Sequence, residues 1–260
     1  MRFFVKLFLK IIRKLGYPGQ LFFELFCFPR YVLNLIHYLR ASNGSSFPIS
    51  CSDLYYSTSD SKQPGGQVDC HYFLQDIWAA RYVNATRPDM HVDIGSRIDG
   101  FISHLLASNQ KVKYLDWRNP EVKDPCFEFV QVDIMKLPFP DNSIKSLSCL
   151  HVLEHIGLGR YGDPVDSEGH MKAVKELVRV LAPGGVLLIS VPIGKEKLCF
   201  DAHRVFAQKT IVTLFRDLAL RQFSFIDPDK NEVQVVNNLD YLENSLYFCG
   251  LFCFSKIVNR

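Results

Sequence analysis

Short apolar segments alternate with segments of helical periodicity from residue 71 to the C-terminal end, and this alternation constrains the fold most. The predicted strands cover residues 90–94, 112–116, 127–133, 143–152, 186–192, 222–227 and a last apolar run at 245–258. The predicted helices cover residues 71–83, 99–108, 170–181 and 209–219. Strands that alternate with helices form a mostly parallel sheet with helices on both faces. The sequence therefore predicts an α/β fold with a doubly wound, mostly parallel, seven-stranded sheet.

Acidic residues follow three of the predicted strands. Asp93 and Gly95 end the first strand, Asp116 ends the second, and Asp133 ends the third. In such sheets a ligand binds beyond the carboxyl ends of the strands, and an acid about 20 residues after the first turn commonly accepts hydrogen bonds from ribose hydroxyls. Aspartate after a strand is also common in ordinary turns, so spacing alone is a weak signal.

Two longer runs strengthen the signal. DIMKLPFPDNSIKSLSCLHVLEHI (133–156) and RVLAPGGVLLISVP (179–192) resemble class I S-adenosylmethionine-dependent methyltransferases, over roughly residues 90–225. DIGSRIDG, SLSCLHVLEHIGLGRYGDP and FDAHRVF resemble an uncharacterised methyltransferase-like family called domain of unknown function 268. The resemblance implies a Rossmann-like class I methyltransferase fold and S-adenosylmethionine as cofactor.

The resemblance also implies which residues bind this cofactor. Asp116 would hold the ribose hydroxyls, Trp117 would pack on the adenine, and Asp133 would bind the adenine amino group. The loop from Asp93 to Gly95 would wrap the methionine part. We add His151, at the end of the fourth predicted strand, to the expected cofactor-binding residues.

The first loop departs from the class I pattern, acid-x-Gly-x-Gly-x-Gly, because Arg97 and Asp99 replace the second and third glycines. Each adds a side chain where the backbone normally approaches the ligand closely. In one hypothesis Arg97 pairs with the ligand carboxylate and joins the cofactor-binding residues. In the other, the side chains narrow the pocket, which then binds something else or nothing. We favour the first, because Asp116, Trp117 and Asp133 have no purpose in an empty pocket.

Residues His151 to His155 match H-x-x-E-H, a pattern of zinc proteases that requires a helix. Here His151 ends a strand pattern, so we expect no metal. Methyl transfer to oxygen needs a base near the acceptor hydroxyl, and histidine suits this role. His155, Asp163 and His203 are the catalytic candidates, although each histidine is equally well explained as a hydrogen-bonded structural residue.

Arg160 and Arg204 would suit an anionic acceptor, such as a phosphorylated or acidic sugar, or would form surface ion pairs. The leading hypothesis is a methyltransferase that acts on a small-molecule or glycan-related acceptor, on oxygen. The alternative is a non-catalytic protein of the same fold that binds or scaffolds a complex for glycan synthesis.

The first 40 residues hold the excess positive charge, with seven Lys or Arg against one Glu, whereas the rest holds 23 basic and 26 acidic residues. The main body therefore gives no reason to expect nucleic acid. Residues 2–15 form a basic amphipathic helical pattern, and Pro29 is expected to interrupt a second helical stretch. Two interpretations remain: peripheral contact with an anionic membrane, or a helical hairpin packed on the body or on a second subunit.

The predicted organisation is a helical N-terminal segment at 1–40, a Ser/Gly-rich linker at 41–69 and a methyltransferase-like domain at 70–260. The eight cysteines form no C-x-x-C pair and several lie in apolar runs, which indicates a reducing compartment. The expected location is the cytoplasm, peripheral at a membrane.

Overall fold

The computed structural model describes residues 18–41, 49–50, 54–56, 68–227, 229–236 and 247–258. The chain divides into two compact units, Met1–Gln67 and Val68–Arg260, and each is described by itself. Among the described residues, no helix is both long enough and apolar enough to cross a membrane. The amphipathic helix predicted for residues 2–15, and most of the predicted linker, lie outside the described residues.

The first unit contains helix α2 (Pro18–Ala41), which runs without a break through Pro29. The expectation that Pro29 interrupts the helix was therefore wrong. A proline inside a helix costs about 3 kcal/mol, because it removes a hydrogen bond and crowds the preceding turn. Packing on α2 offsets this cost: Leu54 is buried against Phe28, Tyr31 and Leu35. Part of the predicted linker thus packs on the helix.

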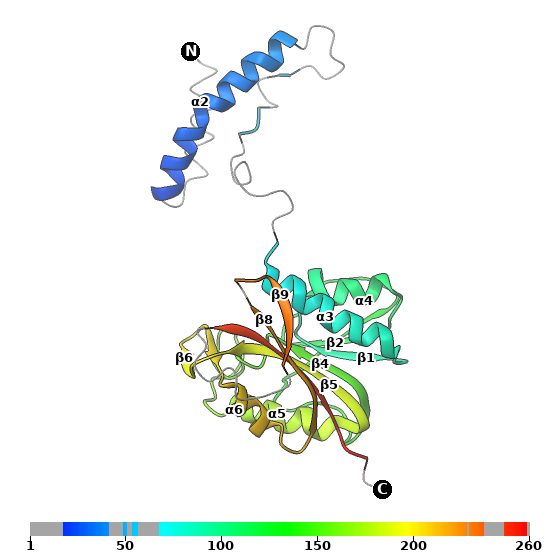
Figure 1. Cartoon of the computed structure of the whole chain (residues 1–260). Helices are drawn as coiled ribbons and strands as arrows, with labels where there is room; N and C mark the ends of the chain where they lie inside the picture. Colours follow the sequence, from blue (N-terminus) through cyan, green and yellow to red (C-terminus); the bar gives the residue numbers. More distant parts are fainter. Residues whose placement is uncertain are drawn as a thin grey trace. The chain divides into compact units, whose positions relative to one another are not determined.

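The second unit is built on an eight-stranded sheet with the order β3-β2-β1-β4-β5-β10-β8-β9 (Figure 1). Strands β1 to β5 pair in parallel, whereas β10 is antiparallel to both of its neighbours, β5 and β8, and β9 is antiparallel to β8. The strands are β1 (His91–Ile94), β2 (Val112–Asp116), β3 (Phe127–Gln131), β4 (Ile144–Leu150), β5 (Leu181–Ile193), β8 (Ala219–Asp227), β9 (Glu232–Val236) and β10 (Phe248–Ser255). A separate hairpin pairs β6 (Lys197–Cys199) with β7 (His203–Val205).

Helices cover both faces of the sheet (Figure 1). One face carries α3 (Cys70–Thr86), the π-helical turn η1 (Ile98–Ile102) and α4 (Ser103–Ala107), and the other carries α5 (Gly169–Val180) and α6 (Gln208–Leu214). Side chains along β5 alternate between the two cores: Leu187 and Ile189 face α5 and α6, and Leu188 faces α3 and α4. Because both faces are buried from residue 187 onward, this part of the strand is apolar except for Ser190, whose hydroxyl donates to Gln75 Oε1.

The predicted fold class is confirmed, with differences at the C-terminal side. Strand β9 and the β6–β7 hairpin were not expected, so the main sheet has eight strands where seven were predicted. Helix α6 ends at Leu214, before the predicted end at residue 219, because β8 already begins at Ala219. Residues 219 and 220 pair with Ser255 and Phe254 of β10, which extends the strand at the expense of the helix.

Candidate functional site

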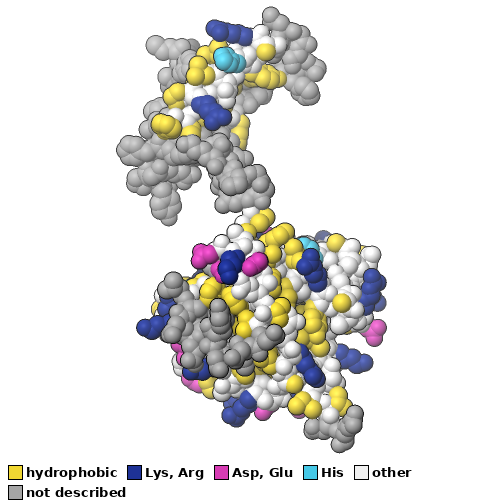
Figure 2. Space-filling view, in the orientation of Figure 1, with side chains coloured by type: hydrophobic (Ala, Val, Ile, Leu, Met, Phe, Trp, Pro, Cys, Tyr) yellow, Lys and Arg dark blue, Asp and Glu magenta, His cyan; other side chains and the backbone are white. Residues whose placement is uncertain are grey.

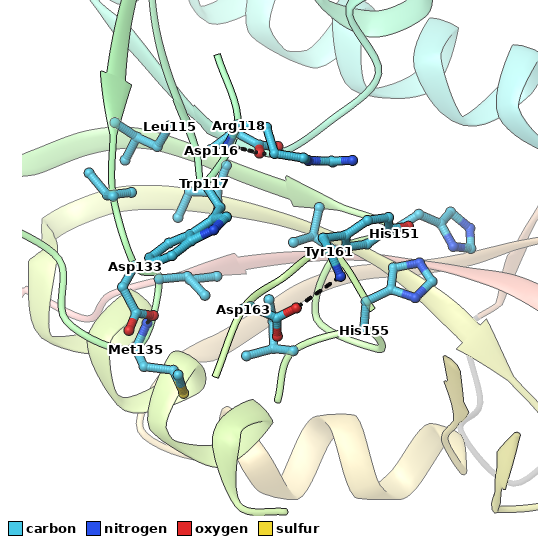
Figure 3. A pocket seen from close by; sticks show the side chains of 16 residues that line it. Leu115, Asp116, Trp117, Arg118, Asp133, Met135, His151, His155, Tyr161 and Asp163 are labelled. Atoms are coloured by element: carbon cyan, nitrogen blue, oxygen red, sulfur yellow. Dashed lines mark hydrogen bonds and ion pairs between the residues drawn. The ribbon is translucent and has the colours of Figure 1, made fainter. Parts of the chain in front are cut away.

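A cavity of about 110 Å³ lies at the carboxyl ends of strands β1 to β4 (Figure 3). Four predicted cofactor-binding residues line it together with Gly95: Asp116, Trp117, Asp133 and His151. The rest of its lining is mostly apolar: Ile94, Leu115, Val132, Ile134, Met135, Val152 and Ile156. The topology places these residues together, because the carboxyl ends of parallel strands meet at one edge of the sheet.

Asp116 already has partners in this cavity. Its Oδ1 accepts hydrogen bonds from the backbone N–H of Arg118 at 2.7 Å and from the Arg118 side chain at 3.3 Å. The Arg118 guanidinium also lies over the ring of Tyr161, 4.2 Å from the ring centroid. The stacked Arg118–Tyr161 pair connects the end of β2 with the loop after β4. A ligand that donates hydroxyls to Asp116 would have to share the carboxylate with Arg118.

Trp117 and Asp133 lie farther along the same cavity, and Figure 3 shows the Trp117 ring between the two aspartates. The ring is 41% exposed, so it presents a large aromatic surface to an incoming ligand. Asp133 Oδ1 accepts a hydrogen bond from the N–H of Met135 at 2.8 Å, which leaves its second oxygen available. Hydrogen-bonding groups at the two ends of an aromatic surface suit a planar ring with polar edges.

Asp93 stabilises the first loop through hydrogen bonds. It is fully buried and does not line the cavity. Its carboxylate accepts hydrogen bonds from the Ser96 hydroxyl at 2.6 Å, the Ser96 N–H at 3.0 Å and the Ser148 hydroxyl. Burial raises the pKa of Asp93 to about 6. Ser148 is also within 2.8 Å of His91 Nε2, and burial lowers the pKa of that imidazole to about 3. This buried network shapes the turn that carries Gly95, which has a φ of +64°.

Arg97 and Asp99 bind each other outside this cavity. The Arg97 guanidinium donates to both oxygens of Asp99, at 3.0 and 2.8 Å, and lies 4.8 Å from the centroid of the Tyr72 ring. Neither residue lines the cavity, so they do not narrow it. The prediction that Arg97 binds a ligand carboxylate stays a prediction. Gly100 has a different role: a Cβ there would lie 1.9 Å from Asp76 Oδ2, so the glycine leaves room for that buried aspartate.

A second cavity, of about 260 Å³, adjoins the first, because His151 and His155 line both. Its other lining residues come from the start of α3, the turn after β4, strands β5 and β7, and the approach to β10: Asp69, His71, Tyr72, Glu154, Pro192, His203 and Tyr247. Two of the three catalytic candidates therefore meet here. The imidazole rings of His155 and His203 lie 6.5 Å apart, centroid to centroid. Burial lowers the pKa of His203.

Asp163 does not join the two histidines. It lines the first cavity, and its carboxylate accepts hydrogen bonds from the backbone N–H groups of Gly157 and Tyr161, each at 3.2 Å. Both contacts are within the loop that follows β4. In this structure Asp163 therefore positions that loop and its Tyr161 ring.

The H-x-x-E-H run does not form the helix that a zinc protease requires. Residues 153–157 form turns, and His151 has a φ of +52°. His151 Nδ1 lies 2.6 Å from Glu154 Oε1, whereas His155 Nδ1 lies 2.6 Å from the carbonyl oxygen of Ala202. Burial by itself would lower the pKa of His151, but Glu154 and Cys249 together outweigh burial and raise it. The two histidines thus have different hydrogen-bond partners, although His155 Nε2 also lies 3.8 Å from Glu154 Oε1.

The two candidate arginines bind backbone carbonyls. Arg204 donates to the carbonyl oxygens of Ile156 at 2.7 Å and Glu154 at 3.4 Å, and burial lowers its pKa. Arg160 donates to the carbonyl of Ala202 at 3.1 Å. Neither lines the second cavity. Their described contacts tie the loop after β4 to the β6–β7 hairpin.

Sequence reasoning missed four residues of the two cavities: Arg118, Tyr161, His71 and Tyr72. No local motif marks them. Tyr161 lies in a glycine-rich stretch at 157–169, and a loop of this kind over a rigid sheet commonly contacts substrates. His71 and Tyr72 begin α3, and only the tertiary fold brings that helix to the carboxyl edge of the sheet.

Comparisons with known proteins agree with this architecture. Residues 138–242 match the model of a family described as Caenorhabditis protein of unknown function, DUF268. No curated protein matches the sequence. The fold is similar to the [4+2]-cyclase SpnF, with a TM-score of 0.51 and 13% identity over 71% of this chain and 82% of that one. It is equally similar to the 1,6-didemethyltoxoflavin-N1-methyltransferase of Burkholderia thailandensis, with a TM-score of 0.51 and 14% identity over 72% of this chain and 80% of that one.

The second of these structures contains bound S-adenosylhomocysteine and 1,6-didemethyltoxoflavin. At such low identity the similarity shows the fold alone, and the two neighbours carry names of different reactions. In this chain the strands have the order β3-β2-β1-β4-β5-β10-β8, with β10 antiparallel to its neighbours. Residues 138–242 of this chain thus match the DUF268 family model, and its fold is similar to that of solved structures that include a methyltransferase.

Proposed function

We propose that this protein is an S-adenosylmethionine-dependent methyltransferase that methylates an oxygen of a small-molecule or glycan-related acceptor. The observation that carries the proposal is the pair of adjoining cavities at one edge of the sheet. The first holds acidic, aromatic and apolar groups suited to a nucleoside, and the second holds two histidines suited to an acceptor. His151 and His155 lie at their junction, where a methyl group would have to pass.

The donor set of the first cavity fits the cofactor. Asp116 and Asp133 offer carboxylate oxygens to hydroxyl and amino groups, and Trp117 offers an aromatic face. The cavity volume, about 110 Å³, is smaller than the roughly 300 Å³ at which ligand pockets begin. Binding would therefore require the Arg118–Tyr161 pair to move aside. Once bound, the cofactor supplies an electrophilic methyl group, and the protein has to hold the acceptor in line with it.

His155 is the residue we assign as the general base. A carbonyl oxygen only accepts hydrogen bonds, so the contact with Ala202 places the proton of His155 on Nδ1. Its Nε2, which lies 3.8 Å from Glu154 Oε1, then carries the lone pair that would accept the proton of an acceptor hydroxyl. His203, from the β6–β7 hairpin, lies across the same cavity and would orient the acceptor.

Isothermal titration calorimetry of the full chain with S-adenosylhomocysteine tests the proposal directly. We expect one site per chain, together with an increase in the melting temperature. No heat and no thermal stabilisation at millimolar ligand would reject the enzyme hypothesis. One observation favours the non-catalytic alternative: Arg118 already binds the Asp116 carboxylate and shares the mouth of a small cavity with Tyr161. In that case the fold would serve as a binding or scaffold protein.

Arg97 provides a sharper test of how the cofactor carboxylate is held. The guanidinium lies over Tyr72, which lines the second cavity, and only Asp99 pairs with it among the described residues. If a ligand carboxylate replaces Asp99, Arg97→Gly should weaken binding of S-adenosylhomocysteine about tenfold, the effect of one charge-assisted hydrogen bond of about 1.5 kcal/mol. Asp99→Ala is the matched variant, and it should leave the affinity unchanged or raise it. Tighter binding by Arg97→Gly would show instead that the side chain obstructs the ligand.

We further propose that helix α2 contacts an anionic membrane surface. Arg30 and Arg40 occupy one side of the helix, with Leu33 and Ile36 exposed near them, and Figure 2 shows hydrophobic and basic side chains interspersed over α2. Apolar side chains in the interface and basic ones at the head groups are the pattern of a peripheral helix. The charge of residues 1–40 adds to this attraction.

Liposome sedimentation at low and high salt tests this contact. Each Lys or Arg near an anionic surface contributes about 1 kcal/mol, so replacing Arg30 and Arg40 together with alanine should weaken binding about 30-fold. Salt should release the protein, because the Debye length is about 8 Å at physiological ionic strength. Arg81 and Lys175, on α3 and α5, provide the matched double-alanine control and should have no comparable effect. Failure of the unaltered protein to sediment with anionic vesicles at low salt would reject the proposal.

A further inference from the structure

Three metal-ligating side chains converge between the two cavities: His71 from α3, His151 from the end of β4 and Cys249 from β10. The Nε2 atoms of the two histidines lie 2.7 Å apart, and Cys249 Sγ lies 3.4 Å from His151 Nε2. All three candidate ligand atoms lie within 4.8 Å of one another. They come from segments far apart in the sequence, so the sheet brings them together and no local motif does.

Hydrogen bonds engage these atoms in part: His71 and His151 pair through their Nε2 atoms, and Cys249 Sγ also lies 3.9 Å from Gln75 Oε1. Glu154 can only accept when ionised, so the 2.6 Å contact places a proton on His151 Nδ1. In neutral His151 the single lone pair is then on Nε2, and both His71 and Cys249 point at it. One lone pair accepts one strong hydrogen bond, whereas a metal ion would accept a lone pair from each of the three atoms.

Glu154 provides a second, independent observation. Its side chain is 1% exposed, and no hydrogen-bond partner for Oε2 is found among the described residues. A buried carboxylate without full pairing is costly. A carboxylate that accepts the Nδ1 proton of a histidine whose Nε2 binds a metal is a recurrent arrangement, and it both orients the ring and balances the charge. Glu154 thus has the position of an outer partner of a bound cation.

The distances are close to those of a tetrahedral site. Zinc–nitrogen bonds of about 2.0–2.1 Å place two nitrogen ligands roughly 3.3 Å apart, and a zinc–sulfur bond of about 2.3 Å places sulfur roughly 3.6 Å from nitrogen. The sulfur of Cys249 is already 3.4 Å from His151 Nε2. The two histidines would separate by a few tenths of an ångström, which small rotations of the partly exposed His71 provide.

We propose that His71, His151 and Cys249 bind a zinc ion that has one coordination position open to the second cavity. Two imidazoles and one thiolate form a ligand set that zinc favours. The fourth position would take water or an oxygen of a ligand in the cavity that His155, His203 and Tyr247 also line. The ligand class is therefore a hydroxyl or carboxylate compound. This site rests on observations of its own, and His151, which lines both cavities, is the residue that it shares with the methyltransferase proposal.

Metal analysis of the purified full chain, kept reduced, tests the site. We expect about one zinc per chain and recovery of zinc by the stripped protein in competition with a chromogenic chelator. Cobalt in place of zinc should give the thiolate-to-metal charge-transfer band and the strong visible bands of tetrahedral cobalt. His71→Gln and Cys249→Ser should each weaken zinc binding at least about 100-fold. Glu154→Gln should weaken it about 10–100-fold, the range for outer partners of metal ligands.

Cys253→Ser and His104→Gln are the matched controls, since Cys253 is another buried cysteine of β10 and His104 is outside both cavities. Both should bind zinc as the parent does. Circular dichroism of each variant shows whether it is folded, and His71, in the first turn of α3, is the safer position if Cys249→Ser misfolds. Absence of zinc binding at micromolar metal overturns the proposal. A loss of zinc affinity in Cys253→Ser equal to that in Cys249→Ser overturns the proposal as well. The same holds if the protein binds no zinc and shows the absorption of a blue copper site instead. Titration of the stripped protein with S-adenosylhomocysteine reports on the first cavity separately.

Discussion

Replacing Asp116 with alanine is expected to weaken binding of S-adenosylhomocysteine by about 10- to 150-fold. The carboxylate is 11% exposed and is the main charged acceptor at the end of β2. Hydrogen bonds to a charged group contribute about 1.5–3 kcal/mol, and this range sets the expected loss. Calorimetric titration of parent and variant measures it. The fold should persist, since Asp116 lies after the last core residue of β2, Leu115.

Two further variants make this result specific. Asp116→Asn retains an acceptor but removes the charge, so its affinity should fall between those of the parent and Asp116→Ala. Asp89→Ala changes an exposed aspartate at the opposite, amino end of β1 and should bind as the parent does. Parent-like binding by Asp116→Ala would mean that the cofactor does not occupy the first cavity. The scaffold alternative would be favoured only if the parent protein itself failed to bind S-adenosylhomocysteine.

The fold could be predicted from the sequence because its signals are local. Apolar strands such as residues 186–192 are buried on both faces, and helix 170–181 has a clear apolar stripe. The parts that were missed depend on tertiary pairing. Residue 219 was predicted to end a helix but begins β8, because residues 219 and 220 pair with β10. Pro29 was expected to end a helix, and packing around Leu54 overrides that local preference.

The candidate site could be predicted only in part. The acids at the strand ends were identifiable, because the topology of parallel strands fixes where such residues meet. What each side chain contacts was not identifiable. Asp163 was taken as a catalytic candidate, yet it holds the backbone of its own loop. Arg97 was expected at the ligand, and in this structure Asp99 holds its guanidinium.

The convergence of His71 and Cys249 on His151 had no sequence signal at all. The H-x-x-E-H run drew attention to His151 and His155 as a pair, but a positive φ at His151 turns the chain away from a helix. His151 then contacts α3 and β10 on one side, and His155 contacts Ala202 on another. Spacing within a motif predicts shared ligation only when the backbone between the residues is helical.

The loop after β4, which carries Tyr161 and Asp163, should be sensitive to a single methyl group at Gly157. This glycine has a φ of +78°, and a Cβ added there would lie 2.0 Å from the carbonyl oxygen of Asp166. The left-handed conformation costs a non-glycine residue about 1–2 kcal/mol, and overpacking costs a further 1–3 kcal/mol. We therefore expect Gly157→Ala to lower the free energy of unfolding by about 2–5 kcal/mol, as measured by urea denaturation.

Gly162 provides a control in the same loop, because its φ of +82° is nearly the same but a Cβ there would contact nothing within 4 Å. Gly162→Ala should thus show the conformational cost of about 1–2 kcal/mol alone. The difference between the two variants then measures the clash with Asp166, where the hydrogen bond from the Asp166 N–H to the Gly157 carbonyl, at 2.9 Å, closes the loop. Equal losses in both variants would show that the loop moves away from the added methyl group, and the Gly157–Asp166 contact would then not fix the position of Tyr161 over the first cavity.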